Sequence, residues 1–263
     1  MMIVSFKTEI PLTDGTLTPV SRLVGKAVQG YAFVNGQFVP TDLEVTPVGE
    51  RRLYRLQTRT GRRIDIAPKG AYVYSASSLM SVGTWQPLEE VPHTTRDKNT
   101  SMRTVEKDIA ELGEFPFFGP DAHDDYWSRV TRDGLFRDNK KNPVPGYLGR
   151  LDEGTLKAVL LPIYFGQSSI KVRDSFDRNR LFHLLTRLGI YTATASVESR
   201  DPSELRITGN VNPTYMTWQP GTIHEYSKPM LLPAYEIKSS HGNVLESNLL
   251  WQARLISSLK KNE

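Results

Sequence analysis

The sequence predicts a mainly β protein with an α+β insertion, and three observations lead to that fold class. Short apolar segments separated by Gly, Pro, Asn and Asp fill residues 3–92. Residues 93–125 change to a polar and then irregular composition. Residues 126–210 combine strand patterns with one clear amphipathic helix. The 263 residues suit two modest domains, or one domain that carries an insertion.

The first region, 1–92, is predicted to consist of strands and turns. Residues 3–6 form the first predicted strand, and 8–12 lead into an Asp14-Gly15 turn. Residues 30–39 contain two apolar patches around Asn35-Gly36, a strong hairpin signal. Two further strand segments follow, at 53–58 and 63–66, and the second alternates as a half-buried strand does.

The middle of the chain contains apolar residues at both helical and strand spacing. Within the linker, 93–125, the pattern predicts a short helix over 101–112. In the region 126–210, the apolar run 156–165 predicts a buried strand, or a strand pair broken at Pro162. Apolar residues at helical spacing predict a helix over 177–188. The remaining predicted strands of this region are 170–173, 190–197 and 205–207.

The last region, 211–263, is predicted to contain a strand over 235–238 and a terminal helix over 248–260. The chain has no cysteine, which excludes disulfides and thiolate chemistry. No apolar run approaches the roughly 20 residues of a membrane helix, and no signal peptide is evident. We therefore expect a cytoplasmic protein of a bacterium or a viral host, without a membrane partner.

The order of features over about 90 residues resembles the horseshoe-shaped Hint module of inteins. The resemblance rests on three segments, 8–15, 52–64 and 83–91. The resemblance places the splicing nucleophile near Ile3, the Thr-x-x-His motif on 67–70, and the terminal His-Asn pair near Trp251-Gln252. It further implies that 211–263 returns to the same module. An unrelated small β-barrel is the alternative.

The residues at these positions lack the chemistry of splicing. A nucleophile needs a Cys or Ser side chain, and Ile3 has neither group. The motif's Thr and His are replaced by Ala67 and Gly70, so the usual polarising groups are absent. The resemblance therefore implies a Hint-like scaffold that does not splice.

Residues 169–190 resemble the strand and helix of LAGLIDADG homing endonucleases, and 204–209 fit the next strand. Any amphipathic helix after a strand is the alternative. In that family a helix ends in an acid followed by Gly, and the acid holds a divalent metal at the scissile phosphate. The resemblance thus makes Asp133 and Glu153 the candidate catalytic residues and Mg²⁺ ligands, unless they are turn residues. Only one repeat is present, so cleavage would need a homodimer or has been lost.

The same resemblance implies double-stranded DNA as the partner, with basic side chains on phosphates. The candidate DNA-binding residues are Lys140, Lys141, Lys171, Arg173, Arg178, Arg180 and Arg187. The formal net charge of +4 is compatible with this role, although a solvated basic surface fits equally well.

The leading hypothesis is an intein-derived, free-standing DNA-binding protein that resembles a homing endonuclease and does not splice. At most it retains residual metal-dependent DNA cleavage, so whether it is an enzyme stays open. The first alternative is a protein-splicing intein in an inactive form. The second is a non-catalytic structural or interaction protein, of viral (phage) origin, that retains only the folds.

Overall fold

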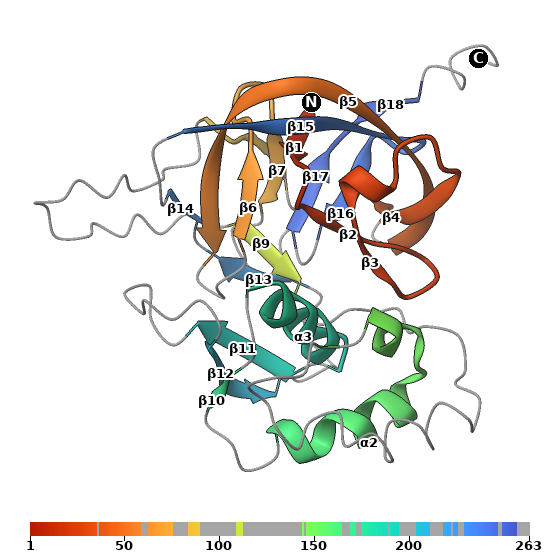
Figure 1. Cartoon of the computed structure of the whole chain (residues 1–263), viewed down its shortest axis with the longest axis vertical. Helices are drawn as coiled ribbons and strands as arrows, with labels where there is room; N and C mark the ends of the chain where they lie inside the picture. Colours follow the sequence, from red (N-terminus) through yellow and green to blue (C-terminus); the bar gives the residue numbers. More distant parts are fainter. Residues whose placement is uncertain are drawn as a thin grey trace, which may run out of the picture. The chain divides into compact units, whose positions relative to one another are not determined.

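The structure is a computed structural model that describes residues 1–35, 37–58, 63–75, 84–89, 109–112, 144, 146–164, 169–171, 175–188, 190–194, 204–210, 218–221, 223–225, 229–246 and 249–256. The chain divides into two compact units (Figure 1). The β unit comprises Met1–Leu12, Thr18–Glu111 and Trp218–Glu263, and the mixed unit comprises Thr13–Leu17 and Leu112–Thr217. The fold is mainly β, as the sequence predicts.

Two long strands organise the larger sheet of the β unit. Strand β5 (Gln37–Thr58) pairs along its length with β15 (Met230–Ser239), and the two ribbons run side by side in Figure 1. The pairing slips between Pro233 and Tyr235, where proline cannot donate to the ladder. The other partners of β5 are β4 (Val28–Val34), β6 (Arg63–Ile66) and β14 (Ile223–Glu225).

The β4–β5 pair is the hairpin predicted around Asn35-Gly36. Asn35 has a φ of 50°, the left-handed conformation that asparagine tolerates well. Gly36 lies outside the described residues. The ladder runs from Val28 opposite Leu43 to Val34 opposite Gln37.

The remaining strands of the β unit close its core. The second sheet contains β7 (Tyr72–Ser75), β8 (Thr84–Pro87), β9 (Ile109–Leu112), β13 (Trp218–Gly221), β16 (Asn243–Glu246) and β17 (Leu249–Gln252). A short separate pair joins β2 (Glu9–Pro11) to β3 (Leu17–Pro19), and one 3-10 turn, η1 (Val20–Arg22), follows. Residues from both sheets, including Met2, Ile66, Val73 and Trp251, form one buried apolar cluster.

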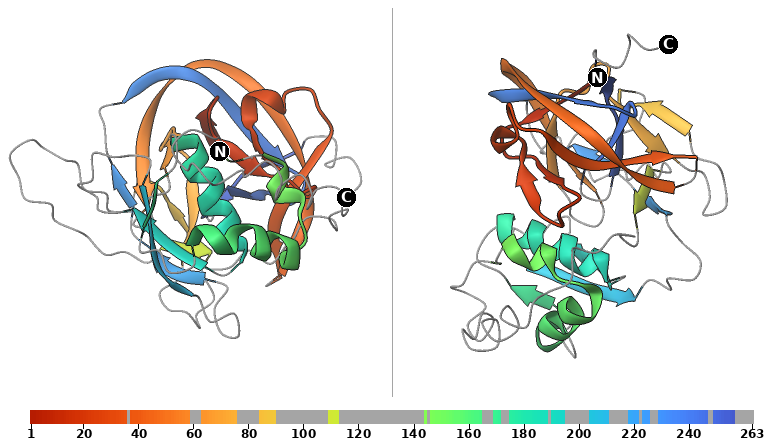
Figure 2. Two further views of the ribbon diagram at one scale, coloured as in Figure 1. Left: turned by 60° about the horizontal axis from the view of Figure 1, so that its bottom comes forward. Right: turned by 90° about the vertical axis from the view of Figure 1, so that its right-hand side faces the viewer.

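The mixed unit packs helices against a small antiparallel sheet (Figure 2). Its elements are η2 (Gly146–Arg150), α2 (Glu153–Tyr164), β10 (Ser169–Lys171), α3 (Ser175–Arg187), β11 (Ile190–Thr194) and β12 (Glu204–Asn210). The sheet order is β10-β12-β11. Leu148, Leu156, Leu160, Leu181 and Leu185 belong to its apolar core.

Three predicted elements are wrong. Residues 156–165 are not a strand, because α2 runs through this segment and is capped by Asp152, whose carboxylate accepts from Thr155 N at 3.0 Å. Residues 249–252 and 254–255 are strands rather than part of a terminal helix. The described end of the predicted 101–112 helix is strand β9. In the described part of the chain, no helix is both long and apolar enough to span a membrane.

Candidate functional site

The edge of β15 opposite β5 holds two short strands in succession. Antiparallel β1 (Met2–Ser5) places Met2 opposite Ile237. Parallel β18 (Arg254–Leu255) places Arg254 opposite Lys238. Because residues 237 and 238 are neighbours on β15, the two strands meet on its edge. The segments that the intein resemblance marks as flanking the two splice junctions are therefore brought together.

Ile3, at the position expected for a nucleophile, is an apolar contact. Its residue is 8% exposed and packs in a small cluster with Leu53 and Ala234. The carbonyl oxygen of Ile3 accepts a hydrogen bond from Ala67 N at 2.9 Å. No side chain at this position can attack a carbonyl carbon.

The segment 67–70 supplies only backbone groups to this edge. Ala67 N donates to Ile3, as above, and the nitrogen of Met1 donates to the carbonyl oxygen of Gly70. Gly70 has a φ of 71°, in the left-handed region where glycine is favoured. Ala67 is thus hydrogen-bonded to β1 and Gly70 to Met1, and neither residue carries an acid or a base.

Trp251 and Gln252 are fixed within β17. Trp251 is fully buried and lies opposite Val73 and Val244. Gln252 lies opposite Asn243, and the next residue, Ala253, donates its N–H to the Gly242 carbonyl at 2.9 Å. The bond that a terminal Asn would break is therefore held by backbone pairing on its C-terminal side.

Glu236 is the charged side chain nearest to both strands, and the sequence analysis missed its role. It lies opposite Ile3 and is 9% exposed. Its Oε1 is 3.4 Å from Nη1 of Arg254, yet this buried oxygen accepts no hydrogen bond from any described residue. The alternation of Glu236 and Lys238 along a predicted strand was the signal that could have revealed one charged face.

Lys238 shares this face but is already paired. Its Nζ lies 2.5 Å from Oε1 of Glu44, which is directly opposite on β5. The four charges form two opposite-sign pairs on one sheet face, and the Met1 ammonium also interacts electrostatically with Glu236. Of the four side chains, Glu236 is the one with a buried oxygen that accepts no hydrogen bond from a described residue.

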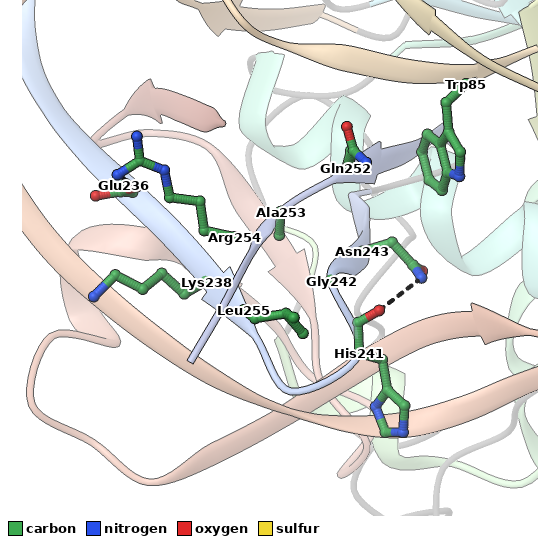
Figure 3. Close-up of a pocket in the computed structure, with 10 residues that line it drawn as sticks. All are labelled: Trp85, Glu236, Lys238, His241, Gly242, Asn243, Gln252, Ala253, Arg254 and Leu255. Atoms are coloured by element: carbon green, nitrogen blue, oxygen red, sulfur yellow. Dashed lines mark hydrogen bonds and ion pairs between the residues drawn. The ribbon is translucent and has the colours of Figure 1, made fainter. Parts of the chain in front are cut away.

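A cavity of about 850 Å³ opens over this face. Its described lining residues are Trp85, Glu236, Lys238, His241, Gly242, Asn243, Gln252, Ala253, Arg254 and Leu255. Figure 3 shows Trp85 and Glu236 at opposite sides of the view, with residues 252–255 running between them. All ten residues belong to the β unit.

The structure does not test the predicted metal ligands, because it describes neither Asp133 nor the side chain of Glu153. Within the described ranges, no cluster of His, Asp and Glu residues is suited to a metal ion. The backbone at Glu153 differs from what the resemblance requires: Glu153 is the first residue of α2 and follows the 3-10 turn η2, whereas the resemblance requires an acid at the end of a helix.

The structure describes the side chains of two of the predicted DNA-binding residues, Arg178 and Arg180. Arg178 is 1% exposed, so its guanidinium does not reach solvent in this conformation. Arg180 donates to the carbonyl oxygen of Val144 at 3.2 Å. Lys171 ends β10 opposite Glu204, and Arg187 ends α3. Lys140, Lys141 and Arg173 lie outside the described residues.

Known proteins match this chain in structure but not in sequence. No protein-family model matches the chain, and no curated protein matches its sequence. A variant of the Ssp DnaB mini-intein matches with a TM-score of 0.46 at 12% identity, over 97% of this chain and 96% of that one. A DnaB intein from Synechocystis sp. PCC 6803 matches with a TM-score of 0.44 at 11% identity, over 97% and 100%.

Proposed function

We propose that the β unit is an intein-derived Hint-like module that no longer splices and now acts as a non-catalytic scaffold. The observation that carries this proposal is the meeting of β1 and β18 on the edge of β15. Protein splicing needs its two junctions side by side, and Met2 and Arg254 lie opposite consecutive residues, Ile237 and Lys238.

The same geometry argues against remaining activity. The Met2–Ile3 peptide bond lies inside β1, and the Met2 side chain is fully buried in the core. Nucleophilic attack at that bond would need a side-chain nucleophile, which Ile3 does not supply. The Gln252–Ala253 bond follows directly after β17, and Ala253 N donates a hydrogen bond to the carbonyl oxygen of Gly242. The backbone at both expected junctions therefore takes part in the hydrogen bonding of the β unit.

A fusion experiment tests the proposal. The chain is placed between two stable reporter domains, and the purified product is measured by intact-mass spectrometry. We expect one unprocessed polypeptide. Cleavage or ligation by the unaltered chain would overturn the loss of splicing.

A second fusion tests the intein origin. It carries Ile3→Cys, Ala67→Thr, Gly70→His and Gln252→Asn, and its matched control carries Ile3→Ala with the other three changes. We expect processing at the 2–3 or 252–253 bond in the first fusion only. A restored variant that folds by circular dichroism and shows no processing would contradict the derivation from an intein.

A further inference from the structure

The outer edge of β18 has free backbone groups. Ile256 N donates to Ser239 O at 3.3 Å, and Leu255 is the residue opposite Ser239. In a parallel ladder, alternate residues of a strand face the partner. Arg254 and Ile256 therefore direct their backbone groups toward β15, whereas the N–H and C=O of Leu255 point away from it. In the described sheet β18 is the terminal strand.

An unpaired strand edge is a template for an added strand. Here the edge borders a cavity of about 850 Å³, which is within the volume range of ligand sites, roughly 300–1,000 Å³. The Leu255 side chain is 48% exposed and supplies an apolar contact beside the free backbone groups. Since residues 252–255 all line the cavity, an extended chain has room along the strand.

Glu236 specifies the chemistry of the occupant. It is nine-tenths buried, and its Oε1 accepts no hydrogen bond among the described residues. Burying a carboxylate without a donor is costly, and a charged donor offsets that cost best. Two cations lie near this carboxylate, Arg254 at 3.4 Å with a side chain that is 61% exposed, and the Met1 ammonium, but neither donates a hydrogen bond to Oε1.

We propose that this cavity binds an extended peptide that adds to the edge of β18 and places a lysine or arginine side chain on Glu236. A strand added to β18 lies about 10 Å from β15, two strand spacings away. Lysine and arginine are the side chains that combine this reach with a cationic donor. Arg254, which lies opposite Lys238, shares the Glu236 face, so a side chain on that face of the added strand points along the cavity toward Glu236.

This inference goes beyond the scaffold proposal and does not depend on an intein origin. Its test is fluorescence polarisation at low ionic strength with a labelled, acetylated hexapeptide of alternating threonine and valine that carries lysine at its third position. The matched peptides replace lysine by norleucine or glutamate, or carry N-methyl groups on alternate residues. We expect the lysine peptide to bind at least about tenfold more tightly than each matched peptide, as expected for one charged hydrogen bond.

Two protein variants sharpen the test. Glu236→Gln should lower the affinity for the lysine peptide at least tenfold without changing the affinity for the norleucine peptide. Arg254→Ala should raise the affinity for the lysine peptide severalfold, because Arg254 no longer competes for the carboxylate. Equal affinities for the lysine and norleucine peptides, unchanged binding of the N-methylated peptide, or no binding at 1 mM, an affinity near −4 kcal/mol, would each overturn the proposal. Circular dichroism and urea midpoints verify that both variants fold.

Discussion

The side-chain amide of Asn243 pairs with the backbone of Phe33 as a neighbouring strand would. Its Oδ1 accepts from Phe33 N at 2.7 Å, and its Nδ2 donates to Phe33 O at 3.2 Å. The two residues are 210 positions apart, and Asn243 is 7% exposed. This one side-chain amide therefore makes two hydrogen bonds from β16 to β4.

Replacing Asn243 should destabilise the β unit. Asn243→Ala removes both side-chain hydrogen bonds to the Phe33 backbone, which costs about 2 kcal/mol of unfolding free energy. Urea unfolding followed by tryptophan fluorescence measures the loss. Asn243→Asp is a second test variant. It keeps an acceptor for Phe33 N but turns a carboxylate oxygen toward the carbonyl oxygen of Phe33, so it should also destabilise the β unit. A change below about 0.5 kcal/mol in both variants, the range of neutral surface substitutions, would contradict this role.

Gly70 should resist substitution for a conformational reason alone. A Cβ built at Gly70 meets nothing within 4 Å, but its φ of 71° disfavours L residues. Gly70→Ala should therefore cost about 1–2 kcal/mol without any clash. Lys69→Ala, at the exposed preceding residue, is the control and should be neutral. Equal urea midpoints for the two variants would contradict the strain argument.

Gly149 should be sensitive to substitution because the backbone of Gly15 lies against it. A Cβ at this position would overlap the backbone oxygen of Gly15, so the backbone must move. We expect Gly149→Ala to cost about 3 kcal/mol or more, in the upper range for strained or overpacked sites. Gly154→Ala in α2 is the control, because its nearest contact is 3.4 Å away and alanine favours helix. Gly149→Ala should lower the thermal unfolding temperature, and Gly154→Ala should raise it. A Gly149→Ala protein as stable as the unaltered protein would contradict the close contact with Gly15.

Asp14 should make the mixed unit acid-sensitive. Burial opposes its ionisation, but hydrogen bonds from Thr16 and the charge and hydrogen bond of Arg150 outweigh burial and lower the pKa of Asp14. Because the folded-state pKa is depressed, its stabilisation is complete above the unfolded-state value of about 3.9 and is lost as pH falls through the folded-state pKa.

The pH profile of the Asp14→Asn variant measures this contribution. At pH 6 the variant should unfold at a lower temperature than the unaltered protein. The two unfolding temperatures should converge as the pH falls through the lowered folded-state pKa of Asp14. Parallel curves across this range would show that the Asp14 carboxylate does not contribute through its charge.

DNA binding by the mixed unit stays a prediction, and its salt dependence decides it. A gel shift with random duplex should show affinity that falls steeply as salt rises. Lys171→Ala with Arg187→Ala should reduce the log–log salt slope by about one per lost phosphate contact. Arg178→Ala should instead lower stability, because Arg178 is buried. Absence of salt-sensitive binding at micromolar protein would eliminate DNA as the partner.

Local signals predicted much of the secondary structure, and tertiary pairing decided the rest. Asn35 and the alternation of 63–66 predicted their strands because the turn and the half-buried face are encoded locally. The segment 249–255 became strands because it pairs with β16 and β15, partners that helical spacing cannot reveal.

The spatial arrangement of the site could not be predicted from the sequence. The resemblance to inteins marked Ile3, Ala67 and Gly70 as positions that lack splicing groups, and the structure adds that Ala67 N donates to Ile3 O. The pairing of Glu236 with Arg254 could not be predicted, since it depends on β15 and β18 being parallel neighbours. Likewise, a patch of arginines on a helix did not predict that Arg178 would turn inward.

The pairing of β5 with β15 has a consequence for biosynthesis. Glu44 and its partner Lys238 are 194 residues apart in the chain. At roughly 5–20 residues per second, the ribosome needs about 10–40 s to make the segment between them. During that interval β5, the longest of the described strands, lacks its partner β15, so their pairing can form in full only after the ribosome has passed residue 239.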